Sequence, residues 1–203
     1  MTNVNCLIAY EDAPSEAVIT RLVSAYAPKL AVTQRFPANG FGQIKANLQR
    51  FRNASNVLPH IVLTDLDQFA CASALLQNWK VLPLHERMLF RIAVREVEAW
   101  LIADRHGIAS LLSVAINKVT TIPDDLPDPK QTLVNLARNS RSRRFASEFV
   151  PATGSVAQIG PLYNDHLCRF AREQWNVQNA VGFSPSLERS VARLRQFAAG
   201  LTT

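Results

Sequence analysis

The sequence predicts an α/β protein with a mostly parallel sheet of about four strands, flanked by helices and followed by a C-terminal helical extension. Three observations support this prediction. Short apolar segments alternate with segments of helical pattern along residues 1–104, which is the order found in parallel, doubly wound sheets. Residues 61–64 are a continuous apolar or β-branched run, as expected of a strand buried on both faces. Residues 105–203 show helical patterns and turn signals instead of strands.

The first half of the chain divides into four strand and helix pairs. The predicted strands are residues 4–10, 31–36, the run from His60 into the Asp65/Asp67 pair, and 88–94. The helices that follow them are predicted from Asp12 to near Pro28, over 44–51, over 69–79 and over 95–104. Asp12 suits the N-cap of the first helix, and Pro14 suits its first turn.

The second half is predicted to be helical. Helical patterns cover residues 106–116, 130–138 with Pro129 in the first turn, a stretch after Gly160-Pro161 that reaches Trp175, and a last helix capped at Ser184. The chain has no repeat and no long linker, and 203 residues are enough for one good-sized domain. We therefore expect an α/β domain over 1–104 with a helical extension over 105–203 packed on it.

Acidic residues follow three of the predicted strands. Glu11 and Asp12 follow the first strand, and Asp65 and Asp67 follow the third. Glu96 and Glu98 follow the fourth. The carboxyl ends of parallel strands converge on one edge of a sheet, where ligands bind. Alternation along the strand would let Asp65 and Asp67 face the same way.

Clustered carboxylates repel one another unless a cation or a proton lies between them, and oxygen ligands suit Mg²⁺ or Mn²⁺. We therefore expect Glu11, Asp65 and Asp67 to share one metal-coordination sphere. For an isolated Asp-x-Asp pair, a helix cap plus a solvated carboxylate is an equally good interpretation; the other two acidic clusters favour the metal site.

The two glutamates after the fourth strand are expected to differ. Helical spacing places Glu98 on the face of Arg91 and Arg95, next to the metal site, whereas Glu96 should point elsewhere. The alternative for Glu98 is a plain ion pair with Arg95.

Three segments of this chain resemble the acidic motifs of the Toprim fold, the metal-binding domain of topoisomerases, primases and OLD-type nucleases: Tyr10-Glu11-Asp12, Thr64-Asp65-Leu66-Asp67 and Val94-Arg95-Glu96-Val97-Glu98-Ala99-Trp100. The helix after the fourth strand is similar to that of small bacterial Toprim-like proteins, among them the RloB-like branch, which are often encoded beside an ATPase of the ABC/AAA type. The resemblance implies metal binding by Glu11, Asp65 and Asp67. It also implies an ATPase partner and a role in anti-phage defence. Asp12 stands where OLD-like relatives commonly have glycine.

Basic residues are concentrated downstream of the acidic motifs. Residues 1–104 carry 10 Lys and Arg against 9 Asp and Glu, a net charge of +1, whereas residues 105–203 carry 12 against 7, a net charge of +5. Lys130 could contact phosphate or the acidic site, or be an exposed lysine at a helix start. Arg141, Arg143 and Arg144 are candidate phosphate contacts, or simply a solvated loop. This layout suits an enzyme that acts on a polyanion.

Composition restricts the cellular setting. Three cysteines are far apart and have apolar neighbours, which favours reduced core residues over disulfides or a zinc site. No apolar run is long enough to span a membrane, and the N-terminus lacks the pattern of a signal peptide. We therefore expect a cytoplasmic protein without a membrane partner.

The predicted function is metal-dependent hydrolysis of phosphodiester bonds in DNA or RNA, with Glu11, Asp65, Asp67 and Glu98 as catalytic residues. Glu11 could hold metal or serve as the general acid and base. Two alternatives remain open. The chain could be a non-catalytic module that binds nucleic acid or an ATPase, with a degenerate acidic site. It could instead be a small phosphotransferase or phosphatase, although it has no glycine-rich phosphate loop.

Overall fold

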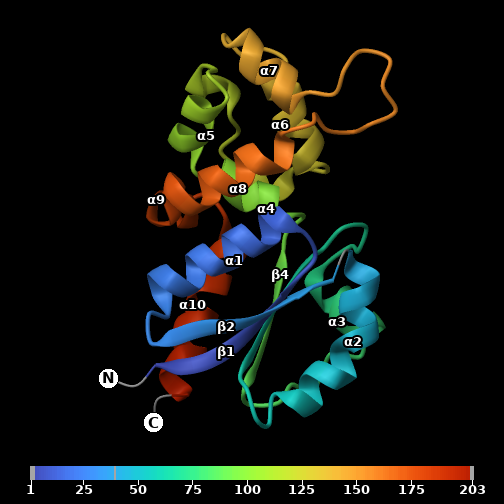
Figure 1. Ribbon diagram of the computed structural model, residues 1–203, viewed down its shortest axis with the longest axis vertical. Helices are drawn as coiled ribbons and strands as arrows, with labels where there is room; N and C mark the ends of the chain where they lie inside the picture. Colours follow the sequence, from blue (N-terminus) through green and yellow to red (C-terminus); the bar gives the residue numbers. More distant parts are fainter. Residues whose placement is uncertain (1–2, 39, 202–203) are drawn as a thin grey trace.

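A computed structural model describes residues 3–38 and 40–201 of the chain. Its sheet consists of β1 (Val4–Tyr10), β2 (Leu30–Pro37), β3 (His60–Asp65) and β4 (Met88–Ala93). The strand order is β2-β1-β3-β4, and every pair is parallel, as Figure 1 shows. The predicted α/β class and the four predicted strands are confirmed. All four C-terminal strand ends therefore lie along the same edge of the sheet.

Helices cover both faces of the sheet. On one face lie α1 (Ala13–Tyr26) and α10 (Pro185–Gly200), and on the other lie α2 (Phe41–Ala54) and α3 (Ala72–Asn78), as Figure 1 shows. Side-chain alternation along β3 divides its residues between the two layers. Ile61 and Leu63 belong to the core under α1, whereas Val62 packs in the core under α2 and α3. This two-sided burial explains why β3 reads as a continuous apolar run.

The segments after β4 share the core under α1. They comprise α4 (Val97–Ile102), α5 (Arg105–Leu111), α6 (Pro129–Ala137), α7 (Arg143–Phe149), α8 (Tyr163–Glu173), α9 (Val177–Val181) and two short 3₁₀ turns, Ile116–Lys118 and Pro123–Asp125. In Figure 1, α5 to α7 stand beyond the strand ends, α8 lies along α1, and α10 returns to β4. Buried Trp100, Phe170 and Leu187 join residues of β1 and β3 in one hydrophobic cluster.

Local capping chemistry sets several helix ends as predicted. The Asp12 carboxylate accepts a hydrogen bond from the Ser15 amide, and Pro14 lies in the first turn of α1. Pro129 begins α6, and the Ser184 hydroxyl accepts from the Leu187 amide at the start of α10.

Four predictions about local structure are wrong. The helix predicted over 69–79 is shorter and covers only Ala72–Asn78 (α3), and the helix predicted from residue 95 begins at Val97. The basic run does not form a loop throughout, because Ser142 caps α7 and places Arg143 and Arg144 in its first turn. Cys6 and Cys168 are buried as expected, but Cys71 is exposed.

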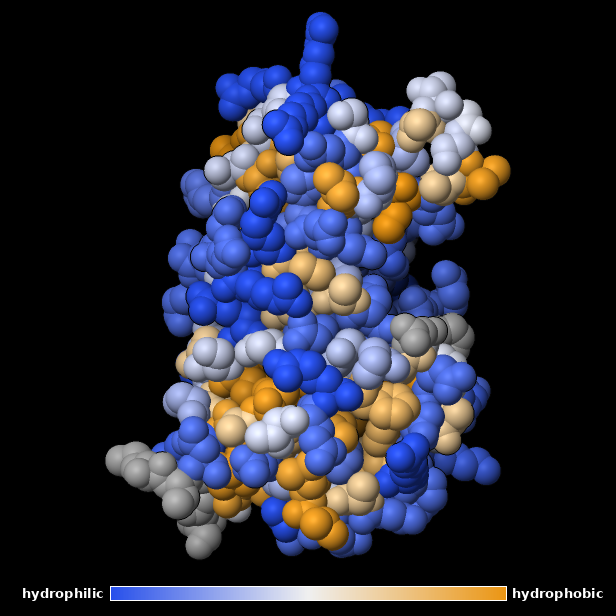
Figure 2. Space-filling model, viewed as in Figure 1, coloured by the Kyte–Doolittle hydropathy of each residue, from blue (hydrophilic) through white to orange (hydrophobic). Residues whose placement is uncertain are grey.

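Apolar residues on the surface are scattered. Figure 2 shows them among hydrophilic residues, with more of them over the sheet than over α5 and α7. The large apolar side chains that are exposed, such as Val57, Leu82 and Val156, belong to different segments. No helix in the described part of the chain is long and apolar enough to cross a membrane.

Candidate functional site

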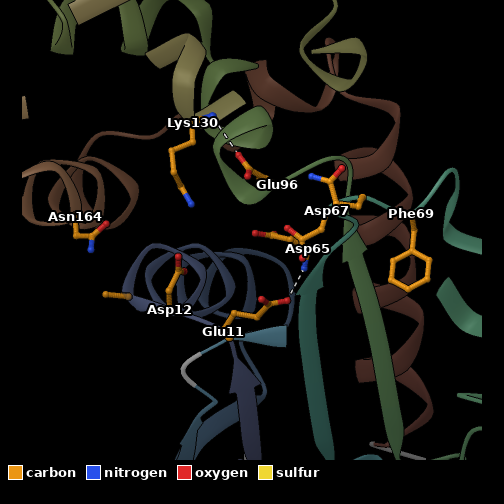
Figure 3. A pocket seen from close by; sticks show the side chains of 11 residues that line it. Glu11, Asp12, Asp65, Asp67, Phe69, Glu96, Lys130 and Asn164 are labelled. Atoms are coloured by element: carbon orange, nitrogen blue, oxygen red, sulfur yellow. Dashed lines mark hydrogen bonds between the residues drawn. The ribbon is translucent and has the colours of Figure 1, made fainter. Parts of the chain in front are cut away.

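A pocket of about 660 Å³ lies at the C-terminal edge of the sheet. Five carboxylates line it, from Glu11, Asp12, Asp65, Asp67 and Glu96, together with one lysine, Lys130. The remaining lining residues are Ala13, Gly40, Gln68, Phe69 and Asn164. Figure 3 shows these side chains entering from β1, α1, β3, the segment before α4, α6 and α8. The predicted convergence of the three acidic clusters on one edge is confirmed.

Glu11 is locked against the end of β3. Its Oε1 accepts a hydrogen bond from the Asp65 amide at 2.9 Å and another, short one from the Thr64 hydroxyl. The neighbouring strands β1 and β3 thus place the two predicted metal ligands side by side, on the same face of the sheet edge. Burial raises the pKa of Glu11, although both hydrogen bonds oppose that rise.

Asp65 is buried among other carboxylates of the site. Its side chain is buried, and Oδ1 accepts from the Val97 amide at 3.0 Å, at the start of α4. Burial raises its pKa well above the usual range for aspartate, and the nearby charges of Glu98 and Glu11 raise it further. Asp65 therefore holds a proton more tightly than a free aspartate does, and a cation bound beside it would oppose this effect.

Asp67 reaches the pocket through a turn and not through strand alternation. β3 ends at Asp65, and Asp67 has a left-handed backbone with φ of 47°. Arg95 holds this turn, because its Nη1 donates to the carbonyls of Asp67 at 2.8 Å and Phe69 at 3.0 Å. Asp65 and Asp67 both line the pocket, as expected. The expected cause, alternation of side chains along one strand, is wrong, because Asp67 lies beyond the end of β3.

Glu96 lies in the pocket, which corrects the expectation that it points elsewhere. Its Oε2 accepts a hydrogen bond from the Lys130 backbone amide at 3.1 Å, as Figure 3 shows. It therefore ties the segment before α4 to the first turn of α6. Burial raises its pKa, and the charge of Lys130 opposes that rise.

Glu98 lies beneath the pocket in α4 and is 1% exposed. Its Oε1 accepts a hydrogen bond from the Tyr163 hydroxyl at 3.2 Å and lies 3.8 Å from Lys130 Nζ. Its Oε2 is buried without a hydrogen-bond partner. Burial raises the pKa of Glu98 to about 7. The alternative of an ion pair with Arg95 is not observed, since Arg95 bonds backbone carbonyls.

Lys130 is the cation of the site. Burial disfavours its ammonium, but the carboxylates of Glu98, Glu96 and Asp12 outweigh burial and raise its pKa. Lys130 therefore stays charged at neutral pH, and Figure 3 shows it pointing across the pocket toward Asp12. Lys130 was predicted either to contact the acidic site or to be an exposed lysine at a helix start. It contacts the acidic site, because its ammonium pairs with Glu98.

The donor set fits a hard divalent cation in its chemistry. The pocket offers five carboxylates and the side-chain amides of Gln68 and Asn164, it holds more negative than positive groups, and Glu98 Oε2 beneath it is buried without a hydrogen-bond partner. Among residues 3–38 and 40–201, however, no three His, Cys, Asp or Glu side chains are arranged to hold a metal ion as they stand. The expected shared coordination sphere of Glu11, Asp65 and Asp67 is therefore not preformed. Mg²⁺ commonly needs only one or two carboxylates, with water and substrate phosphate completing its shell.

The predicted basic contacts lie apart from this pocket. None of Arg141, Arg143 and Arg144 lines it, and Figure 1 places α7 at the end of the molecule away from the sheet. All three are exposed, and Arg144 pairs with Glu148 at 3.1 Å. They could contact only a ligand much longer than the pocket.

Sequence reasoning missed two side chains that α8 contributes. Tyr163 is fully buried, and its hydroxyl donates a hydrogen bond to Glu98. Asn164, next to it, lines the pocket. Gly160-Pro161, shortly before these residues, indicates the start of a helix. Nothing in the sequence indicates that this helix start lies at the edge of the sheet.

Comparisons of this chain with models of protein families, with curated proteins and with solved structures found no match.

Proposed function

We propose that this protein hydrolyses phosphodiester bonds in DNA or RNA with Mg²⁺ or Mn²⁺. One observation carries the proposal: five carboxylates and a charged lysine line a single pocket at the C-terminal edge of a parallel sheet. Such a pocket attracts divalent cations, and a phosphodiester brings the negative oxygens that complete a cation's shell.

Glu11, Asp65 and Asp67 are the residues that would hold the ion. When bound, a divalent ion supplies a Lewis acid for the phosphoryl group and lowers the pKa of a water. Because the pKa of all three carboxyls is raised, metal ions and protons would compete for them. Glu11 is the alternative general acid and base, because two hydrogen bonds to its Oε1 fix the orientation of its carboxyl group.

Lys130 and Glu98 act as a pair in this proposal. The ammonium of Lys130 can bind a phosphate oxygen in the pocket, while Glu98 holds the lysine from below at 3.8 Å. Tyr163 fixes Glu98 in turn through its hydroxyl. Glu98 is thus a positioning residue, because it lies under the pocket and does not line it.

A second candidate is a non-catalytic module that binds nucleic acid or an ATPase. The absence of a preformed three-ligand group among the described residues favours it, because a degenerate site would show the same arrangement. In that case Lys130 would serve as the permanent counter-ion of the acidic pocket.

Cleavage of labelled DNA and RNA with Mg²⁺ or Mn²⁺ tests the proposal, both with the protein alone and with an ATPase encoded beside it. Asp67→Ala should abolish cleavage but leave nucleic-acid affinity unchanged or slightly higher, because it removes a ligand and a negative charge near phosphate. Asp125→Ala, an exposed acidic residue outside the pocket, is the matched control and should cleave normally. Binding without any cleavage by the wild type would favour the module instead.

The wider setting belongs to the same proposal. The Toprim resemblance implies an ABC/AAA-type ATPase as partner and anti-phage defence as the role. We place the protein in the cytoplasm, where its three free cysteines would stay reduced.

A further inference from the structure

Three arginines converge where α10 packs against β4, outside the acidic pocket. Arg91 is on β4, and Arg189 and Arg193 are one turn apart on α10. Ser186 precedes Arg189, and Ser190 precedes Arg193, by three residues each along α10. The Ser190 hydroxyl accepts from Arg91 Nε at 3.3 Å, which fixes the guanidinium against the helix. We refer to Arg91, Arg189 and Arg193 as the arginine cluster.

The arginine cluster has no anion of its own. Within the described part of the chain, none of its three members forms an ion pair with a carboxylate. Arg91 is half-buried, and burial together with the positive charges of Arg193 and Arg189 lowers its pKa to about 10. Placing like charges around a half-buried guanidinium is unfavourable unless a counter-ion compensates.

A small cavity opens at this place. It has a volume of about 110 Å³. Arg91, Arg189 and Ser186 form its polar wall, the rest of its lining, including Val94, is apolar, and Arg193 lies outside the lining. A water molecule takes up ~30 Å³ of liquid, so the cavity admits a group of a few heavy atoms, such as a phosphate, but no base or sugar. β4 is the edge strand of the sheet, so its outer backbone groups have no strand partner. The cavity therefore combines positive charge with hydrogen-bond donors.

We propose that the arginine cluster is a phosphate-binding site at the outer edge of β4. Arginine presents a planar fork of donors that matches two oxygens of a phosphate, and Arg91 keeps both terminal nitrogens available because only its Nε bonds Ser190. The phosphate belongs either to a nucleic-acid backbone or to a small phosphorylated molecule. The proposal does not require that the acidic pocket cleave anything.

The cluster is also close in the chain to the acidic pocket. Val94 lines the small cavity, and Glu96, two residues later, lines the acidic pocket. Likewise, Phe69 lines the acidic pocket, and Ala72, three residues later in α3, lines the small cavity. The segments on either side of Arg95 thus border both cavities. A nucleic-acid strand could place one phosphate at the cluster while a second lies at the carboxylates.

Melting curves with inorganic phosphate test the site directly. Phosphate should replace chloride at constant ionic strength and pH, with EDTA present so that no divalent ion binds the acidic pocket. A ligand that binds the folded state alone raises the melting temperature in proportion to the logarithm of its concentration above its dissociation constant. We expect this rise in the wild type, and a loss of about tenfold in phosphate affinity for each arginine removed.

Two variants and one control make the result interpretable. Arg91→Met keeps the buried aliphatic stem, and the double variant Arg189→Met/Arg193→Met changes only exposed positions, so it carries the test if the first does not fold. Arg50→Met removes an exposed arginine from α2 on the other face of the sheet and should respond like the wild type. A wild type without a response, or site variants that respond like the wild type, would overturn the proposal.

Fluorescent oligonucleotides then identify the source of the phosphate. If it is a nucleic-acid backbone, the double variant should weaken binding of every sequence and flatten the salt dependence by ~0.9 log units per lost contact on duplex DNA, or ~0.7 on single strands. Unchanged oligonucleotide binding in a variant that has lost its phosphate response would assign the site to a small phosphorylated molecule. Loss of cleavage in Asp67→Ala leaves both readouts untouched, so failure of the nuclease proposal is distinguishable from failure of this one.

Discussion

Replacing Glu98 with glutamine tests whether the buried carboxylate beneath the pocket costs the folded protein free energy at neutral pH. Its pKa is about 7 in the folded state, compared with 4.5 for a free glutamate side chain. The folded state therefore holds a proton that the unfolded state releases, so this group stabilises the fold most at low pH and loses that contribution as pH rises toward 7. This rise in pKa corresponds to roughly 3 kcal/mol, most of which is lost between pH 5 and pH 8.

Glu98→Gln keeps the size of the side chain and an acceptor for Tyr163 but has no proton to lose. The free energy of unfolding should therefore decline less steeply with pH in the variant, by up to roughly 2–3 kcal/mol between pH 5 and pH 8. Lys130 keeps its other carboxylate neighbours, Glu96 and Asp12, so the variant does not strand a buried cation.

Urea denaturation at a series of pH values, with EDTA to exclude divalent ions, measures this difference. The other pocket carboxyls contribute to both proteins and cancel in the comparison. Glu173→Gln, at an exposed position at the end of α8, is the control and should follow the wild type. Parallel pH profiles for the wild type and Glu98→Gln would refute the argument that burial raises the pKa of Glu98 by more than the charge of Lys130 lowers it.

Three further predictions concern the pocket and the basic run. Mg²⁺ or Mn²⁺ should raise the melting temperature of the wild type by mass action, and Asp65→Asn should reduce this response; equal responses would show that the ion binds elsewhere. Tyr163→Phe should lower the free energy of unfolding by about 1–3 kcal/mol in urea titrations, because it leaves a buried carboxylate oxygen with one partner fewer; an unchanged stability would mean that the hydroxyl is dispensable. Changing Arg141, Arg143 and Arg144 to alanine should weaken oligonucleotide binding for all sequences alike and flatten its salt dependence by up to ~0.9 log units per contact on duplex DNA; unaltered binding would show that nucleic acid does not reach α7.

The sequence was sufficient for features that depend on neighbouring residues. The apolar run of β3, the Asp12 cap of α1 and the proline that begins α6 are all local signals, and each appears in the structure where it was predicted. The parallel topology followed from the alternation of strands and helices. That topology in turn brings Glu11 and Asp65 together, because adjacent parallel strands end at the same edge.

Tertiary structure decided how the acidic residues are used. Helical spacing predicted that Glu98 is near the metal site and that Glu96 points away, yet Glu96 lines the pocket and Glu98 lies beneath it. The reason is that the helix begins only at Val97, so Glu96 precedes it and is not bound by helical spacing. Asp67 likewise owes its place to a left-handed turn held by Arg95, which alternation along a strand does not foresee.

The sequence by itself thus determined the sheet, its caps and the edge where carboxylates gather, because these depend on periodicity and on residues a few positions apart. Only the fold decided that Lys130 pairs with Glu98, that Tyr163 bonds Glu98 from 65 residues away, and that Arg91 meets arginines of α10 about a hundred residues later. Each of these contacts depends on how α6, α8 and α10 pack on α4 and the sheet. That packing is set by the burial of a shared core and leaves no periodic trace at the polar residues it brings together.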